Sequence, residues 1–133
     1  MNNINIKQSM KREENIEVDL WSIANENNPA IFIDKVKKLT EREDLYISSR
    51  QLRKIYDEFT SINTEELDES KIKIHMAKMI MEINYASNRK AIKEKIKNMI
   101  EKLFREILNS PTIENYQKAL MLITALIAFK KGE

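Results

Sequence analysis

Few residues of this chain are of a type that could perform catalysis. His75 is the only histidine and there is no cysteine, so a histidine or thiolate metal cluster cannot form within one chain, and a nucleophile would have a single imidazole as its base. The only glycine is Gly132, which excludes the glycine-rich loops that cradle phosphates. We therefore expect a protein that is not an enzyme and that has no metal site and no cofactor.

The candidate acid–base groups have structural explanations. We expect His75 to lie on the polar edge of a helix. The carboxylate pairs Glu65-Glu66 and Asp68-Glu69 fall at an expected helix start, where negative charge complements the helix dipole.

Basic side chains are the remaining candidates for chemistry. Lysine and arginine that neutralise phosphates bind nucleic acid without reading its sequence, and the affinity falls steeply with salt. If the helices that carry them adjoin, the candidates form one positive surface; the alternative, that they are simply solvated helix faces, stays open on composition alone. The candidates are Arg50, Arg53, Lys54, Lys78, Arg89, Lys90, Lys93 and Lys97.

The charge of the chain is unevenly distributed. Residues 1–69 contain 10 Lys and Arg against 15 Asp and Glu, a net charge of −5, whereas residues 70–133 contain 13 against 6, a net charge of +7. Within the first half, Arg53 with Asp57 and Lys54 with Glu58 are spaced as i,i+4 ion pairs, which would compensate part of the positive charge. The second half is the basic one.

Composition indicates an all-α protein. One glycine and two prolines in 133 residues leave little of the turn chemistry that β-hairpins require. A chain of this length buries roughly two thirds of its unfolded surface. We expect a compact single-domain bundle of about five to six helices over residues 17–133, with residues 1–16 disordered.

The absence of cysteine and the hydropathy of the chain indicate in which cellular compartment we expect the protein. The absence of cysteine makes a reducing cytoplasm the natural default. The first fifteen residues lack the apolar segment of a signal peptide, and the most apolar run, Ala119–Phe129, is shorter than the ~20 residues that span a membrane. We expect a soluble, cytoplasmic protein without membrane contact.

Local signals place the helices. Asn28-Pro29 and Ser110-Pro111 are typical of cap and first-turn pairs, and Ser48 with Gln51 forms a capping box. After a short amphipathic segment around Val18–Ile23, the expected helices are Pro29 to about Glu41, Ser49–Phe59, Lys71–Arg89, Lys90–Leu108 and Thr112 to about Lys130.

The segment Lys71–Arg89 is expected to be the central helix, because it is apolar on two sides. One face carries Ile72, Met76, Met79, Ile80 and Ile83, and the opposite face carries Ile74, Met81 and Tyr85. A polar stripe between them, which consists of Lys71, His75, Lys78 and Glu82, should keep one edge in solvent.

Three segments carry a family resemblance. SSRQLRKIYDEF (Ser48–Phe59), INYASNR (Ile83–Arg89) and ALIAFKK (Ala125–Lys131) resemble, in order and spacing, the small helical subunit of type III-A CRISPR-Cas effector complexes, the Csm family. The resemblance covers about residues 47–131.

The resemblance implies a non-catalytic protein that lies along the guide RNA and its single-stranded target RNA. Its implied partners are further copies of itself, a large polymerase-like subunit and a filament of backbone subunits. It also implies that Arg50, Arg53, Lys54 and Arg89 contact phosphates, whereas Lys78, Lys90, Lys93 and Lys97 rest on charge alone.

Two other functions are compatible with parts of the sequence. A helical adaptor that binds only protein could use the apolar Ala119–Phe129 helix as its docking face. A helix-turn-helix that binds duplex DNA is disfavoured, because the helix after Thr60–Thr64 opens with four acids that duplex phosphates would repel.

Overall fold

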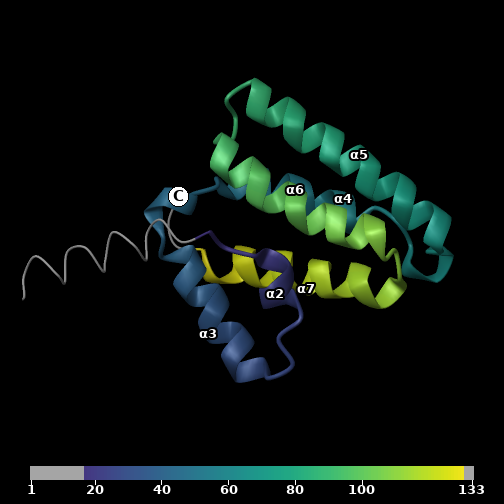
Figure 1. Cartoon of the computed structure of the whole chain (residues 1–133), viewed down its shortest axis with the longest axis horizontal. Coiled ribbons are helices and arrows are strands. Elements are labelled where there is room, and N and C mark those ends of the chain that lie inside the picture. The colour runs from purple at the N-terminus through teal and green to yellow at the C-terminus, as the bar shows by residue number, and fades with distance from the viewer. Residues whose placement is uncertain (1–16, 131–133) are drawn as a thin grey trace, which may run out of the picture.

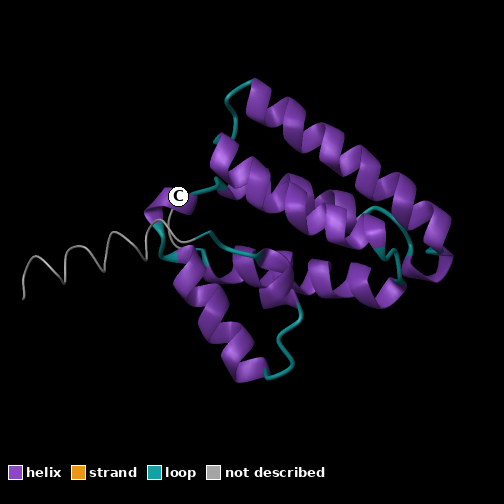
Figure 2. Ribbon diagram, in the orientation of Figure 1, coloured by secondary structure: helices purple, strands orange, loops and turns teal. Residues whose placement is uncertain are grey.

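The computed structural model describes residues 17–130, which form six α-helices and no strand (Figures 1 and 2). The predicted all-α bundle is confirmed, whereas the predicted disorder of residues 1–16 concerns residues outside the described part. The elements are α2 (Leu20–Ala24), α3 (Pro29–Thr40), the 3₁₀ turn η1 (Glu43–Leu45), α4 (Ser49–Thr60), the 3₁₀ turn η2 (Thr64–Glu66), α5 (Glu69–Asn88), α6 (Glu94–Asn109) and α7 (Ile113–Phe129).

Two predicted helix starts are confirmed by their caps. The Asn28 side-chain oxygen accepts hydrogen bonds from the amides of Ala30 and Ile31, and Pro29 is the first residue of α3. The Ser48 hydroxyl accepts from the Gln51 amide at 3.2 Å at the start of α4. Such caps satisfy amides that have no partner within the helix.

The predicted start of the next-to-last helix was wrong. This helix, α6, begins at Glu94 rather than Lys90. Lys90 adopts φ 62°, a left-handed conformation that ends a helix, and the Ala91 amide donates to the Ala86 carbonyl at 2.9 Å. The chain must reverse direction between α5 and α6, and residues 89–93 make this reversal.

Two further boundary predictions were wrong. The cap of α7 is Thr112, whose hydroxyl accepts from the Asn115 amide at 3.1 Å, while Ser110 closes α6. Glu65 and Glu66 lie in η2, before the cap of α5. In both places the residue that caps the helix, Asp68 for α5 and Thr112 for α7, lies further along the chain than predicted.

The central helix of the bundle is α7, not the segment Lys71–Arg89. Helix α7 packs against α2, α3, α4, α5 and α6, whereas α5 packs mainly on α6 and lies at an edge of the molecule (Figure 1). The second apolar face of α5 is therefore uncovered: Ile74, Met81 and Tyr85 are 71%, 65% and 63% exposed. The apolar surface of α7 is the one that the bundle buries.

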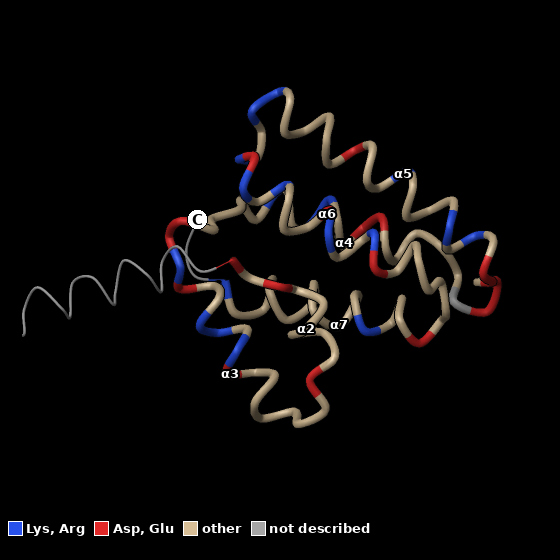
Figure 3. Tube along the Cα trace, viewed as in Figure 1, with Lys and Arg blue, Asp and Glu red and all other residues tan. Residues whose placement is uncertain are grey.

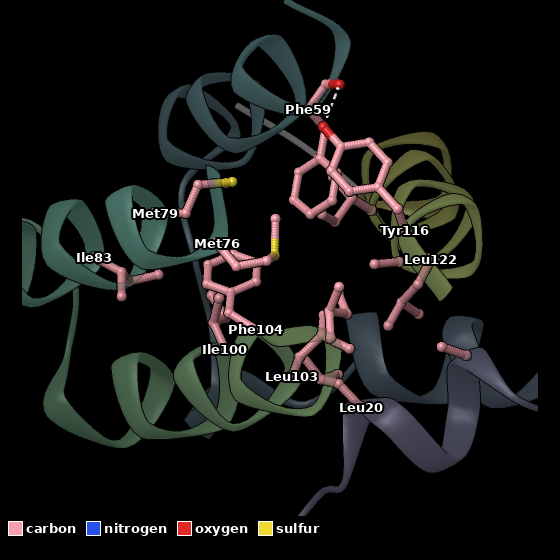
Figure 4. Close-up of a cluster of buried hydrophobic side chains, with 14 of the residues drawn as sticks. Leu20, Phe59, Met76, Met79, Ile83, Ile100, Leu103, Phe104, Tyr116 and Leu122 are labelled. Carbon is pink, nitrogen blue, oxygen red and sulfur yellow. Dashed lines mark hydrogen bonds between the residues drawn. The ribbon is translucent and has the colours of Figure 1, made fainter. Parts of the chain in front are cut away.

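A cluster of aromatic rings joins α4, α6 and α7 in the core. The ring centroid of Phe59 lies 4.9 Å from that of Tyr116 and 5.9 Å from that of Phe104, and all three side chains are buried (Figure 4). Aromatic pairs at such distances add to the stability gained from burial.

His75 also belongs to this cluster, contrary to the prediction that it faces solvent. It is 6% exposed, and its ring centroid lies 6.1 Å from Phe59 and 5.9 Å from Tyr116. His75 follows Ile72 by three residues and precedes Met79 by four, which is the spacing of residues on one helix face.

Candidate nucleic-acid interface

The first candidate cations lie on α4. Leu52 and Phe59 are buried on the inner side of this helix, whereas Arg50, Arg53 and Lys54 are exposed. The capped start and the buried inner side hold α4 in place, so its cations are presented by a rigid element.

The predicted intrahelical ion pairs of α4 are not present in residues 17–130. Neither Arg53 with Asp57 nor Lys54 with Glu58 lies within ion-pair distance; instead Glu58 pairs with Lys78 of α5 at 3.2 Å. The cations of α4 are thus less compensated than the spacing suggested.

Lys78 is the candidate cation with carboxylate partners. Besides Glu58, it lies 3.8 Å from Glu82 on its own helix. The hydrogen bond to Glu58 raises the pKa of Lys78 above its ordinary value. Its charge is therefore largely compensated by two carboxylates.

A cleft of about 630 Å³ lies between α4 and α5. Buried apolar side chains line it, among them Met79, Ile83, Ile92 and Phe104. Around them stand Arg50 and Lys54 from α4, and Tyr85 and Arg89 from the end of α5.

Acidic residues also line the cleft. The start of α4 and the end of α5 lie at the same side of the molecule, because the two helices run in opposite directions (Figure 1). Arg50 and Arg89 therefore share one end of the cleft, whereas Glu58, which pairs with Lys78, comes from the end of α4 at the other; Glu82, one turn before Tyr85, lines the cleft between them. We call the end with Arg50 and Arg89 the basic end of the cleft.

The α5–α6 turn forms a second, more open hollow of about 630 Å³ next to the basic end. Its lining includes Lys90, Lys93 and Lys97 together with the acidic Glu94, and Ile92 lines both hollows. Lys93 is the N-cap residue of α6. Basic residues gather at this turn and at the start of α6 in Figure 3.

Six of the eight candidate cations therefore line two adjoining concave surfaces, which we call the basic surface. Arg53 lines neither hollow and Lys78 is paired. Among the described residues, none of the six lies within 4 Å of a carboxylate. The basic surface consists of Arg50, Lys54, Arg89, Lys90, Lys93 and Lys97.

The sequence reasoning missed Tyr85 as a member of this site. It was expected to be buried against a neighbouring helix, but it is 63% exposed and lines the cleft. The Arg89 guanidinium carbon lies 5.3 Å from the centre of its ring, within the range of a cation–π interaction. The i,i+4 spacing of Tyr85 and Arg89 was the available signal.

The described residues provide no group of three or more histidine, cysteine or carboxylate side chains that could hold a metal ion. His75 is buried, and its Nε2 atom has no hydrogen-bond partner in this part of the chain. Within residues 17–130, no helix is long and apolar enough to cross a membrane.

A comparison with known protein families shows to which family this chain is related. The family model described as Csm2 Type III-A matches residues 26–133. The chain belongs to this family. The match confirms the resemblance drawn from three short motifs and extends it toward the N-terminus, to residues that the motifs did not reach. Neither the curated proteins nor the solved structures include a match.

Csm2 membership makes this chain a small subunit of a type III-A CRISPR complex. Two of the three motifs meet at the cleft: Ser48–Phe59 falls at the start and along the length of α4, and Ile83–Arg89 is the end of α5.

The third Csm2-like motif ends α7 near the start of α4. The Lys130 ammonium nitrogen lies 3.9 Å from the centre of the Tyr46 ring, and Ile47, the next residue, lines the cleft. The described part of this motif therefore supports the segment that leads into α4.

Proposed function

We propose that this Csm2-family subunit lies along the guide RNA and the paired target RNA, and that it stabilises bound target by contacts from the basic surface to phosphates. It carries out no chemistry itself in this proposal. The observation that carries the proposal is that six cations, from α4, the end of α5 and the start of α6, line two adjoining hollows without carboxylate partners among the described residues.

The electrostatics of RNA favour such a surface. Each phosphate that a cation neutralises releases condensed counterions, so affinity is gained without reading bases. A subunit that must accept any guide sequence needs this kind of contact. Phosphates follow one another along an RNA strand. The cations likewise follow one another along the surface, from the cleft around the α5–α6 turn.

The test is a charge reversal in the assembled complex with guide RNA. The isolated subunit is a poor sample. Several weak contacts to one RNA give a high affinity only when the sites that make them are held together, as they are in the assembled complex. We expect Arg50→Glu with Arg89→Glu to weaken binding of several unrelated target RNAs by similar factors. The slope of log affinity against log salt should fall by about 0.7 for each phosphate that the variant no longer neutralises.

Lys38→Glu with Lys37→Glu is the matched control for the double reversal. Both lysines are exposed on α3, on the side of the molecule away from α5 (Figure 1). If the double reversal leaves affinity and slope unchanged, or if the control variant reduces them equally, the basic surface is not the RNA contact.

A second candidate function, contact with another subunit of the complex, is favoured by the uncovered face of α5. The adaptor hypothesis placed its docking face on α7, but there Leu122 is fully buried in the bundle. The exposed Ile74 and Met81 side chains provide an alternative apolar face, and large exposed apolar side chains on one face are typical of interfaces.

We expect Ile74→Asp with Met81→Asp to fold normally, because both side chains are mostly exposed, and to lower the amount of this subunit that co-purifies with the complex. Lys71→Asp on the same helix is the control for added negative charge. Normal incorporation of the double variant would exclude this face as an interface.

A further inference from the structure

Tyr85 is exposed in a position that the bundle does not explain. It is 63% exposed, and its ring lines the basic end of the cleft together with Arg50 and Lys54 of α4. A tyrosine that served only the core would have its ring covered, as Tyr116 does at 1% exposure.

The ring of Tyr85 is accompanied by a guanidinium group. Arg89 lies one helical turn further along α5, and its Cζ atom is 5.3 Å from the ring centre. Aromatic rings and guanidinium planes are the two kinds of side chain on which unstacked nucleobases stack. Both are present here on one rigid helix.

We propose that Tyr85 and Arg89 form a stacking site for an unpaired nucleobase of RNA, with Arg50 and Lys54 neutralising the phosphates beside that base. This inference rests on the proposed function, since it assumes that RNA reaches the basic surface. It adds a contact that is selective for single-stranded over paired nucleotides and tolerant of base identity, because every base has a π-face.

A protein partner is the competing occupant, since Tyr85 shares its exposed side of α5 with Ile74 and Met81. Of these three residues, only Tyr85 lines the cleft. It also has an arginine over its ring, and Arg50 and Lys54 line the same cleft. The cations around the Tyr85 ring favour a ligand that has a negative charge and a flat ring over an apolar protein surface.

The test uses the assembled complex with guide RNA and target RNAs that each carry 2-aminopurine at one position that is left unpaired with the guide. Tyr85→Leu removes the aromatic ring and keeps an apolar side chain, and Tyr85→Phe is the matched variant that keeps the ring. We expect Tyr85→Leu to weaken target binding by at least about fivefold, with an unchanged salt slope because stacking releases no counterions. At the stacked position, 2-aminopurine fluorescence should rise in Tyr85→Leu and stay quenched in Tyr85→Phe.

Three results would overturn the inference. They are unchanged affinity in Tyr85→Leu, an equal loss in Tyr85→Phe, and loss of the Tyr85→Leu subunit from the purified complex, which would assign the face to a protein contact. Arg50→Glu separates this inference from the proposed function. If Arg50→Glu lowers affinity and slope while Tyr85→Leu changes neither, only the stacking site is wrong; if Arg50→Glu also has no effect, the proposed function fails.

Discussion

The phenolic oxygen of Tyr116 donates a hydrogen bond to the backbone carbonyl of Phe59 across 2.8 Å, between the first half of α7 and the last turn of α4 (Figure 4). The two residues are 57 positions apart in the chain, and both are 1% exposed. This bond fixes α4, which carries three of the candidate cations, to the central helix. The stability of the bundle and the placement of the basic surface are therefore linked.

Tyr116→Phe should destabilise the protein while leaving the fold intact. The variant keeps the ring that packs 4.9 Å from Phe59 but leaves a buried carbonyl without its hydroxyl donor, which costs about 1–2 kcal/mol. Chemical denaturation measures the free energy of unfolding. Tyr85→Phe is the control, because this exposed hydroxyl should change it by less than about 0.5 kcal/mol. Equal stability of both variants would contradict this role.

Tyr116 should also make stability fall at alkaline pH. Burial, together with a smaller contribution from the negative charge of Glu58, raises the pKa of Tyr116 from 10.0 to about 12. Between these values the unfolded state has lost the proton that the folded state retains, so stability decreases as pH rises through this window. Denaturation at pH 9 and pH 11 should show a drop in the wild type that is smaller in Tyr116→Phe.

His75 should weaken the fold at mildly acidic pH. Burial lowers its pKa below the ordinary 6.5; Glu58 opposes this shift and Lys78 adds to it. The unfolded state therefore takes up a proton first, and stability falls as pH decreases below about 6.5, by at most about 1.4 kcal/mol per pH unit. His75→Phe should remove this slope between pH 7 and pH 5.5. An unchanged slope would assign the effect to other groups.

Glu58→Gln should strengthen target RNA binding. It removes a carboxylate that lines the cleft and releases Lys78 from its closest partner, 3.2 Å away. The gain should be up to about fivefold, corresponding to ~1 kcal/mol for an exposed pair, with a steeper salt dependence. Asp34→Asn on α3 is the control for loss of one negative charge. A loss of affinity in Glu58→Gln would show that Lys78 needs this pairing for its placement.

Asp44 should couple energetically to Lys95. Its carboxylate lies 2.7 Å from Arg42 and 2.6 Å from Lys95, which ties η1 to α6. The hydrogen bonds from Arg42 and then from Lys95 hold the pKa of Asp44 well below 3.8, so their contribution is present above that pH and is lost as pH falls below it. A double-mutant cycle of Asp44→Asn and Lys95→Met should give a coupling of about 0.5–1 kcal/mol that weakens in 1 M salt. Additive effects would contradict it.

Several features of the fold were predictable because their causes are local. Asn28 and Ser48 cap helices through amides two or three residues away, so the neighbouring residues alone specify the starts of α3 and α4. The same is true of the inward positions of α4 and α6, which follow from the helical period. Where several caps lie close together, as at Ser110 and Thr112, local reasoning chose the wrong one.

The choice of central helix was not predictable from one helix at a time. The periodicity of α5 and the nearly uniform apolar surface of α7 both permit burial on two sides. Which helix is covered depends on how six helices fill one core, and in the described part of this bundle α7 is the helix that contacts all five others. The exposed face of α5 and the burial of His75 follow from that packing.

For the functional site, the sequence by itself determined the candidate cations, among them Arg50 and Arg89, and the three motifs that identified the family. Only the tertiary structure decided which of these cations line the same surface. Arg50 and Arg89 line one cleft because α4 and α5 run in opposite directions, and the same arrangement pairs Lys78 with Glu58 and leaves Tyr85 exposed. The physical reason is that charges interact over a few ångströms in space, whereas Arg50 and Arg89, like Glu58 and Lys78, are separated by twenty or more positions along the chain.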